Sequence, residues 1–239
     1  MHVKHYYIVY NLLNTALRFA MSIFQENAVT ASDKAFFRLR KEIVEGEIPA
    51  SAKLSETELS TKYEVSRAVV REAINRLESC NLVERKPNVG ARVVALSPEG
   101  LIELYQVRES LEGMAARLAA TNMSDNEVAE LKMLLNSQSE NIKTTERYYQ
   151  EAGDLDFHYR IILGSKNNHL INMLVNGLYH LVRMYRVQLG MAGPRVSTAF
   201  DEHKHIVQAI SNRDPELAEM LMRRHIMYSK NNIEAKLNQ

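Results

Sequence analysis

The stretch VSRAVVREAINRLE, residues 65–78, constrains the fold most, because its apolar residues repeat with the period of an amphipathic helix. Four of them fall at positions i, i+3, i+4 and i+7, which places them on one face that we expect to be buried. The four are Val70, Ala73, Ile74 and Leu77. The opposite side of the helix then carries Arg67, Ala68, Arg71 and Asn75. Ser66 is a good N-cap, so the helix is expected to begin directly after it.

The segments on either side predict a helix-turn-helix with a β-hairpin wing. The sequence DKAFFRLRKEIVEG, residues 33–46, places Ala35, Leu39 and Ile43 on one helical face and ends on a glycine. In LSETELSTKY, residues 54–63, Ser55 and Glu58 have the spacing of a capping box, so a second helix should begin there. After the third helix, LVERKPNVGARVVAL, residues 82–96, predicts two strands around a turn at residues 87–90.

This arrangement indicates DNA binding, because the N-terminal residues of the second helix of such a module contact base edges in the major groove. Arg67 and Arg71 occupy that position, small Ala68 lies between them, and the expected wing is basic. The candidate contacts are Ser66, Arg67, Ala68, Arg71, Asn75, Lys86 and Arg92. Either arginine could read a guanine or hold a phosphate, and the sequence does not distinguish the two. The alternative interpretation is a solvated helix face, since Glu72 and Glu78 lie nearby.

The composition favours a cytosolic protein of two compact domains. The chain has 239 residues, 46% of them hydrophobic, which suffices for two cores. Its net charge is +1, so an anionic partner must be met by a local patch rather than by the whole molecule. Cys80 is the single cysteine, which excludes an internal disulfide and fits a reducing compartment.

Residues 1–30 are expected to form an extension outside the fold. The segment YYIVYNLLNTALRFAMSIF, residues 6–24, is apolar, but Asn11, Asn14 and Arg18 interrupt it. A bilayer span needs about 20 predominantly apolar residues with few charges, so no membrane association is expected. Met21 is an alternative start of the protein. We expect a DNA-binding domain at residues 31–96 and an all-helical domain at residues 97–239.

The helical part contains a candidate metal site. Asp154 and His158 are one turn apart on one helical face. His203 and His225 are equidistant from a turn at residues 212–215, so an antiparallel helical hairpin brings them to the same height. Asp154, His158, His203 and His225 form a workable set of metal ligands. Chance pairing is the alternative, because the chain has eight histidines, and His205 is expected to face solvent.

The segment from residue 35 to about residue 96 resembles the winged helix-turn-helix of the GntR family of bacterial transcription regulators. The resemblance lies in Leu54, Glu56, Leu59 and the run VSRAVVREA, and in a wing glycine, Gly90. It implies that Arg67, Arg71 and Gly90 act at an operator. Two departures stand out: Pro49-Ala50 replaces the usual Pro-Gly, and Ala68-Val69 replaces the common Thr-Pro. The lost threonine hydroxyl at position 68 leads us to expect a different operator sequence.

From about residue 97 onward the chain is similar to the FCD ligand domain of the FadR-type GntR subgroup. The resemblance lies in VRESLEGMAARLAA at residues 107–120, in the motifs around Asp154 and His203, and in ELAEMLMRRHI at residues 216–226. It implies that the four metal-site residues hold a divalent ion, most often zinc or nickel, above a pocket for small carboxylates. Arg108 matches the family's arginine at the start of this domain and is the first candidate to pair the acid. Arg183 and Arg186 are further candidates.

The sequence therefore predicts a mostly α protein: an N-terminal winged helix-turn-helix followed by an all-α antiparallel helical bundle. Our preferred hypothesis is a metabolite-responsive transcription regulator, a repressor rather than an activator, that binds a twofold operator in double-stranded DNA as a homodimer. In this hypothesis a small organic acid is the effector. Two alternatives remain at this point. One is a metal-dependent hydrolytic enzyme that uses the Asp/His cluster, and the other is a regulator whose metal is purely structural.

Overall fold

The computed structural model describes residues 30–87, 89–145, 150–188 and 196–237. The side chains of residues 137–156, 186, 196–197 and 236–237 lie outside this description. The expected N-terminal extension, except for Thr30, and the alternative start at Met21 also fall outside the described residues.

The first domain is a winged helix-turn-helix. Helix α2 spans Ala31–Val44, α3 spans Glu56–Tyr63 and α4 spans Arg67–Ser79. The predicted buried stripe of α4 is confirmed, since Val70, Ala73, Ile74 and Leu77 are the residues this helix buries. The predicted caps are also present: the Ser66 side chain accepts a hydrogen bond from the backbone N–H of Val69, and Ser55 accepts one from Glu58.

The wing is an antiparallel hairpin of β1, Val83–Lys86, and β2, Gly90–Val93. Val83 pairs with Val93 and Lys86 with Gly90, so the alternation of side chains turns both valines into the core of the domain. Gly90 has a φ of +86°, a left-handed conformation that favours glycine at the start of the second strand.

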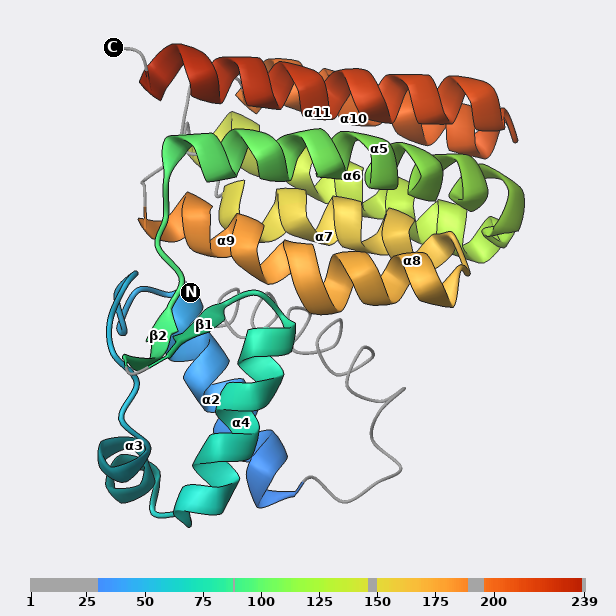
Figure 1. Cartoon of the computed structure of the whole chain (residues 1–239). Coiled ribbons are helices and arrows are strands. Elements are labelled where there is room, and N and C mark those ends of the chain that lie inside the picture. Colours follow the sequence, from blue (N-terminus) through green and yellow to red (C-terminus); the bar gives the residue numbers. More distant parts are fainter. Residues whose placement is uncertain (1–29, 88, 146–149, 189–195, 238–239) are drawn as a thin grey trace.

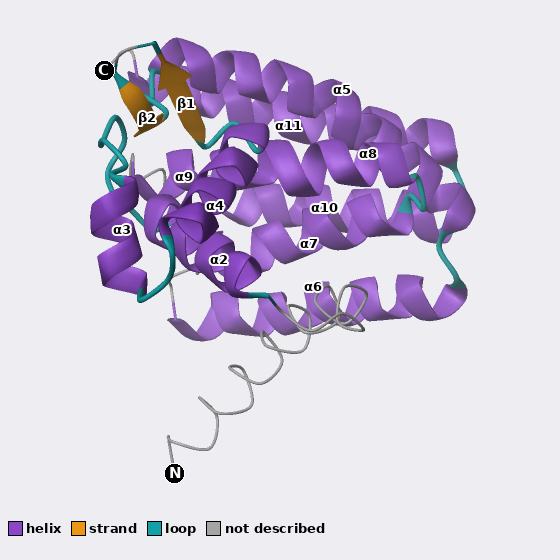
Figure 2. Cartoon of the chain, turned by 60° about the horizontal axis from the view of Figure 1, so that its bottom comes forward, coloured by secondary structure: helices purple, strands orange, loops and turns teal. Residues whose placement is uncertain are grey.

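The second domain is an antiparallel bundle, and the predicted fold class is confirmed. Its helices are α5 (Pro98–Asn122), α6 (Asp125–Thr145), α7 (Gln150–Gly164), α8 (Asn168–Met173), α9 (Tyr179–Gln188), α10 (Val196–Ser211) and α11 (Pro215–Leu237), and the predicted turn at residues 212–215 separates the last two. A π-helical turn, η1 (Leu174–Leu178), joins α8 to α9 and was not predicted. Figure 1 shows the bundle above the winged helix, and Figure 2 shows the two strands gathered at one end of the molecule. No helix among the described residues is both long and apolar enough to cross a bilayer.

Helix α9 belongs to the cores of both domains. Its Val182 and Tyr185 pack in the bundle core, whereas Met184 is fully buried in the core of the winged helix. Gln188, at its end, donates to the carbonyl oxygen of Ile43 and accepts from the backbone N–H of Ala50, with heavy-atom distances of 2.9 and 3.2 Å. The position of α9 in the bundle therefore sets the position of the winged helix.

Candidate metal centre and nucleic-acid interface

Three histidines from three helices meet in the core of the bundle. His158 comes from α7, His203 from α10 and His225 from α11, and all three are buried. The Nε2 atom of His225 lies 3.2 Å from that of His203 and 3.2 Å from that of His158. The predicted pairing of His203 with His225 across the α10–α11 hairpin is thus present, and His158 joins it.

The spacing of these nitrogens fits one shared divalent ion. Tetrahedral coordination with metal–nitrogen bonds of about 2.0–2.1 Å separates neighbouring ligand nitrogens by about 3.3–3.4 Å. The three candidate ligand atoms lie within 4.8 Å of one another. Such a cluster of imidazoles is a common ligand set for zinc and nickel.

Two of the rings are oriented by carboxylates on the side away from the cluster. The Nδ1 atom of His158 lies 2.6 Å from Oε2 of Glu112, and that of His225 lies 2.7 Å from Oε2 of Glu202. A carboxylate that accepts the Nδ1 proton leaves Nε2 with a lone pair for a metal, as is usual around metal-bound histidines. The ring of His203 is stacked on Phe157 at 3.9 Å between centroids.

Arg108 extends this network into the core. Its Nε donates to Oε1 of Glu112 at 2.6 Å, both side chains are 1% exposed, and its guanidinium lies 4.6 Å from the ring centre of Tyr105. Burial raises the pKa of Glu112, but the charges and hydrogen bonds of Arg108 and His158 outweigh it and lower that pKa to about 2. Glu112 is therefore an anion that holds His158 on one side and Arg108 on the other.

The remaining candidates of the helical domain are placed as follows. Asp154 is one turn before His158 on α7, but its side chain lies outside the described residues, as does that of Arg186. Arg183 turns toward the winged helix, where it pairs with Glu45 at 3.6 Å. His205 is exposed, as expected.

The predicted DNA-contact face of the winged helix is exposed along α4. Arg67, Ala68, Arg71 and Asn75 are exposed, as the helical period predicted, and the N-cap Ser66 is exposed with them. The sequence did not reveal that Glu56, in the first turn of α3, lies beside both arginines. Its carboxylate oxygens are 2.9 and 2.7 Å from Nε and Nη2 of Arg71, and 4.0 Å separates it from Nη2 of Arg67.

Two of the basic wing residues form hydrogen bonds to other parts of the domain, whereas the third, Lys86, is paired only with its neighbour in the strand among the described residues. Arg92 donates to the carbonyl oxygen of Ser51 at 2.9 Å, so this guanidinium also braces the strand. Arg85 donates to the side-chain oxygen of Asn75 and so ties the wing to α4. Lys86 is exposed at the end of β1, with Glu84 at 2.9 Å, and Gly90 is exposed opposite it.

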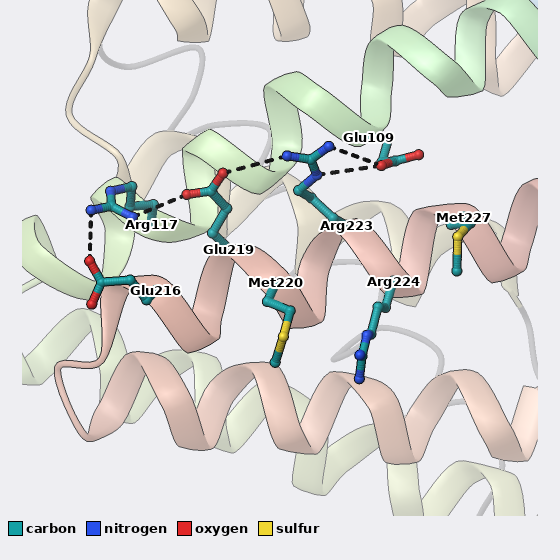
Figure 3. Close-up of a pocket in the computed structure, with 8 residues that line it drawn as sticks. All are labelled: Glu109, Arg117, Glu216, Glu219, Met220, Arg223, Arg224 and Met227. Atoms are coloured by element: carbon teal, nitrogen blue, oxygen red, sulfur yellow. Dashed lines mark hydrogen bonds and ion pairs between the residues drawn. The ribbon is translucent and has the colours of Figure 1, made fainter.

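A groove of about 420 Å³ lies on the surface of α5 and α11 rather than at the histidines (Figure 3). A ladder of ion pairs lines one side of it: Arg117 contacts Glu216 and Glu219, and Arg223 contacts Glu109 and Glu219. Met220, Arg224 and Met227 complete the lining along α11. The groove is open and carries both signs of charge. These properties fit the binding of another protein surface better than the binding of an enclosed small molecule.

The comparisons with known proteins agree with this architecture. The model of the bacterial regulatory proteins of the gntR family matches residues 31–93, and that of the FCD domain matches residues 103–227, more than half of the chain. A "Probable D-xylose utilization operon transcriptional repressor" of Paenarthrobacter nicotinovorans is 30% identical over 185 residues, 77% of this chain and 80% of the relative. The gluconate operon transcriptional repressor of Bacillus licheniformis is 29% identical over 75% of each chain.

Solved structures support the fold. The Escherichia coli protein McbR/YncC superposes with a TM-score of 0.69 at 20% identity, covering 88% of this chain and 100% of its own. A GntR regulator from Rhodococcus sp. RHA1 gives 0.65 at 22% identity, with 85% and 97% covered. Relatives of this family are transcription regulators and not enzymes, which rules against the hydrolytic alternative. The chain is a DNA-binding transcription regulator and belongs to the GntR family, with an FCD domain behind its winged helix.

Proposed function

We propose that this regulator is a repressor whose helical domain binds one divalent metal ion and a small organic acid, and that the acid changes its affinity for a twofold operator. The observation that carries the proposal is the convergence of three buried Nε2 atoms, two of them on rings held from behind by Glu112 and Glu202. Asp154 is the proposed fourth ligand, and zinc or nickel are the proposed ions.

An acid effector fits the chemistry of this site. When bound, the ion supplies an open coordination position that accepts a carboxylate oxygen. Arg108 is the proposed partner of the acid's other oxygen, because the structure buries it in the same network, joined to His158 through Glu112. Arg186 remains a second candidate, whereas the pairing of Arg183 with Glu45 favours a role for Arg183 at the domain junction.

The route from this site to DNA runs through α9. Met184 lies in the winged-helix core, while Val182 and Tyr185 lie in the bundle core. A shift of α9 in response to the acid therefore moves the winged helix-turn-helix as well. In a dimer this changes the distance between two recognition helices, and half-sites one helical turn apart, about 34 Å, tolerate little misalignment.

We propose that the α5–α11 face forms the homodimer. Among the described residues, five of the nine exposed large hydrophobic side chains lie on these two helices: Val107, Met114, Leu217, Met220 and Tyr228. The ion-pair ladder of Figure 3 adds both signs of charge on the same two helices, so the surface is complementary to a copy of itself across a twofold axis. Met220→Glu with Met114→Glu should shift the purified protein to monomers in sedimentation. Unchanged dimers would contradict this choice of face.

The test of the metal-and-acid proposal uses the whole protein, a duplex selected by it from a randomised library, and a panel of small mono- and dicarboxylates. We expect about one metal ion per chain in the purified protein, and at least one acid that changes the duplex affinity about 5- to 150-fold, as is typical of allosteric coupling. His158→Ala should remove both the metal and the acid response. The control is His205→Ala, which removes an exposed histidine from α10, the helix of His203, and should change neither.

The acid panel also separates this proposal from a purely structural metal. If the metal is present but no acid that binds the helical domain changes the duplex affinity, the ion only braces the bundle. If His158→Ala leaves the metal content unchanged, the three rings are not the site.

A further inference from the structure

Glu56 and Arg71 form a two-point contact between the two helices of the helix-turn-helix. Both carboxylate oxygens are used, one by Nε and one by Nη2, at 2.9 and 2.7 Å. This is the planar, bidentate pairing that fixes the orientation of a guanidinium as well as its position. The side chain of Arg71 is still 57% exposed, so it is held but not covered.

The edge of Arg71 that stays outward matches a guanine. An arginine has five N–H donors, and Glu56 takes the Nε edge with one hydrogen of Nη2. The Nη1–Nη2 edge then offers two parallel donors, which is the pattern that O6 and N7 of guanine accept in the major groove. A fixed guanidinium loses less conformational freedom when it binds a base than a mobile one does.

The charge of this pair disfavours a phosphate on the same arginine. The hydrogen bond from Arg71 lowers the pKa of Glu56 despite some burial, so the carboxylate is an anion at neutral pH. The pair is therefore close to neutral, and a phosphate at the outer edge would face the like charge of Glu56 across one guanidinium.

Arg67 is in the opposite situation. Its Nη2 lies 4.0 Å from Glu56, beyond hydrogen-bond distance, and its side chain is 63% exposed. It occupies the first position of α4, where no hydrogen bond from the described residues fixes its guanidinium and its charge is offset less by Glu56 than that of Arg71 is. These are the properties of a phosphate contact, which needs charge and reach but little geometry.

We propose that Glu56 is a positioning residue that commits Arg71 to reading a guanine and leaves Arg67 to hold a phosphate. The inference rests on the proposed role of α4 as the operator-reading helix. It assigns one base pair of each half-site to the Glu56–Arg71 pair.

The experiment measures affinity for the selected duplex, for each of its single-base-pair variants, and the dependence of affinity on salt. Arg71→Ala and Glu56→Ala should both lose preference at the same G·C pair, by about 5- to 150-fold for the arginine and by a smaller factor for the glutamate. Arg67→Ala should weaken binding to all duplexes alike and reduce the salt slope by about 1, with base preference kept.

Glu58→Ala is the matched control. Glu58 is an exposed acid in the same first turn of α3, so its loss removes the same charge and the same interaction with the helix dipole, but it forms no ion pair with either arginine among the described residues. This variant should keep the full base preference.

Three results would overturn the assignment. The first is that Glu56→Ala leaves both the base preference and the affinity unchanged. The second is that Glu56→Ala tightens binding to every duplex without loss of base preference. The third is that Arg67→Ala, and not Arg71→Ala, loses the preference for the G·C pair. The second result would make Glu56 a competitor of DNA rather than a positioning residue. If neither arginine variant changes DNA affinity, it is the reading role of α4 that fails.

Discussion

Two arginine–glutamate pairs in this chain have nearly the same bond lengths and opposite surroundings. Arg108 and Glu112 meet at 2.6 Å in the core of the bundle, where both side chains are 1% exposed. Arg71 and Glu56 meet at 2.7 Å at the tip of the winged helix, where the side chains are 57% and 26% exposed. Both pairs join a guanidinium to a carboxylate, with two hydrogen bonds at the exposed site and one at the buried site, so the larger difference between them is their exposure to solvent.

The length of an ion pair therefore does not indicate whether the pair stabilises the fold or serves the recognition of a partner. In water a pair of opposite charges contributes little to stability, because solvent screens it and the side chains lose entropy. In the core the removal of one partner leaves an uncompensated charge, which is strongly destabilising. The exposed pair is therefore expected to serve recognition, and the buried pair to fix the geometry of the metal site.

Removal of Arg108 should give the largest effect. Arg108→Ala leaves Glu112 buried with His158 as its remaining described partner, so we expect the free energy of unfolding in urea at pH 7 to fall by about 3–5 kcal/mol. Arg71→Ala, its exposed counterpart, should leave the unfolding midpoint unchanged. Equal losses for the two variants would break the comparison.

Much of the fold could be predicted because its signals are local. The stripe of α4, the caps Ser55 and Ser66, and the glycine of the wing are read from neighbouring positions in the chain. The place of Met184 could not be predicted in this way, since an apolar residue on an amphipathic helix gives no sign that it packs against a different domain.

The meeting of the three histidines could be predicted from the sequence, whereas the residues that orient their rings could not. The hairpin symmetry of His203 and His225 is a local signal, whereas the bond between His158 and Glu112 joins positions 46 residues apart. Glu56 and Arg71 are likewise brought together by the turn between two helices. The one available hint was the i, i+4 spacing of Arg108 and Glu112, which is also common on exposed helix surfaces.

Removal of the proposed metal ion should lower the stability of the protein through the buried site and should not depend on the exposed Glu56–Arg71 pair. A bound ion at 100 to 1,000 times its dissociation constant stabilises the folded protein by about 3–4 kcal/mol. Chelation should therefore lower the melting temperature by about 6–16 °C in a thermal scan. The Glu56→Gln protein should show the same drop as wild type, and His158→Ala should show none. A drop of equal size in His158→Ala would place the ion elsewhere.

Conservative replacement of the exposed arginines sharpens the comparison at the DNA. Lysine keeps the charge but cannot form the bidentate contacts, so Arg71→Lys should lose about 5- to 150-fold in affinity for the selected duplex. Arg67→Lys should change it little, because a phosphate accepts a point charge. Fluorescence anisotropy with labelled duplex measures both, and equal losses would show that the two arginines are used alike.

The junction between the domains should show the smallest effect, as a dependence on pH. Arg40 of α2 donates from Nη1 to Nε2 of His180 on α9 at 3.0 Å. Burial and the positive charges of Arg40 and Arg183 lower the pKa of His180 from its ordinary 6.5 to about 3. Between pH 6.5 and pH 3, His180 is protonated in the unfolded chain but not in the folded chain. Its contribution to stability is therefore complete above pH 6.5 and is lost as the pH falls toward 3.

Between pH 7 and pH 5.5 this linkage should remove about 1 kcal/mol from the free energy of unfolding, a modest amount because the ring is only partly buried. His180→Gln should abolish that part of the pH dependence, and His169→Gln, which changes an exposed histidine of α8, should keep the wild-type curve. The same slope in all three proteins would mean that protonation of His180 does not open the junction. If only His180→Gln loses this pH dependence, the Arg40–His180 contact contributes about 1 kcal/mol to the free energy of unfolding. That contribution is smaller than the one expected for the buried Arg108–Glu112 pair and larger than the one expected for the exposed Arg71–Glu56 pair.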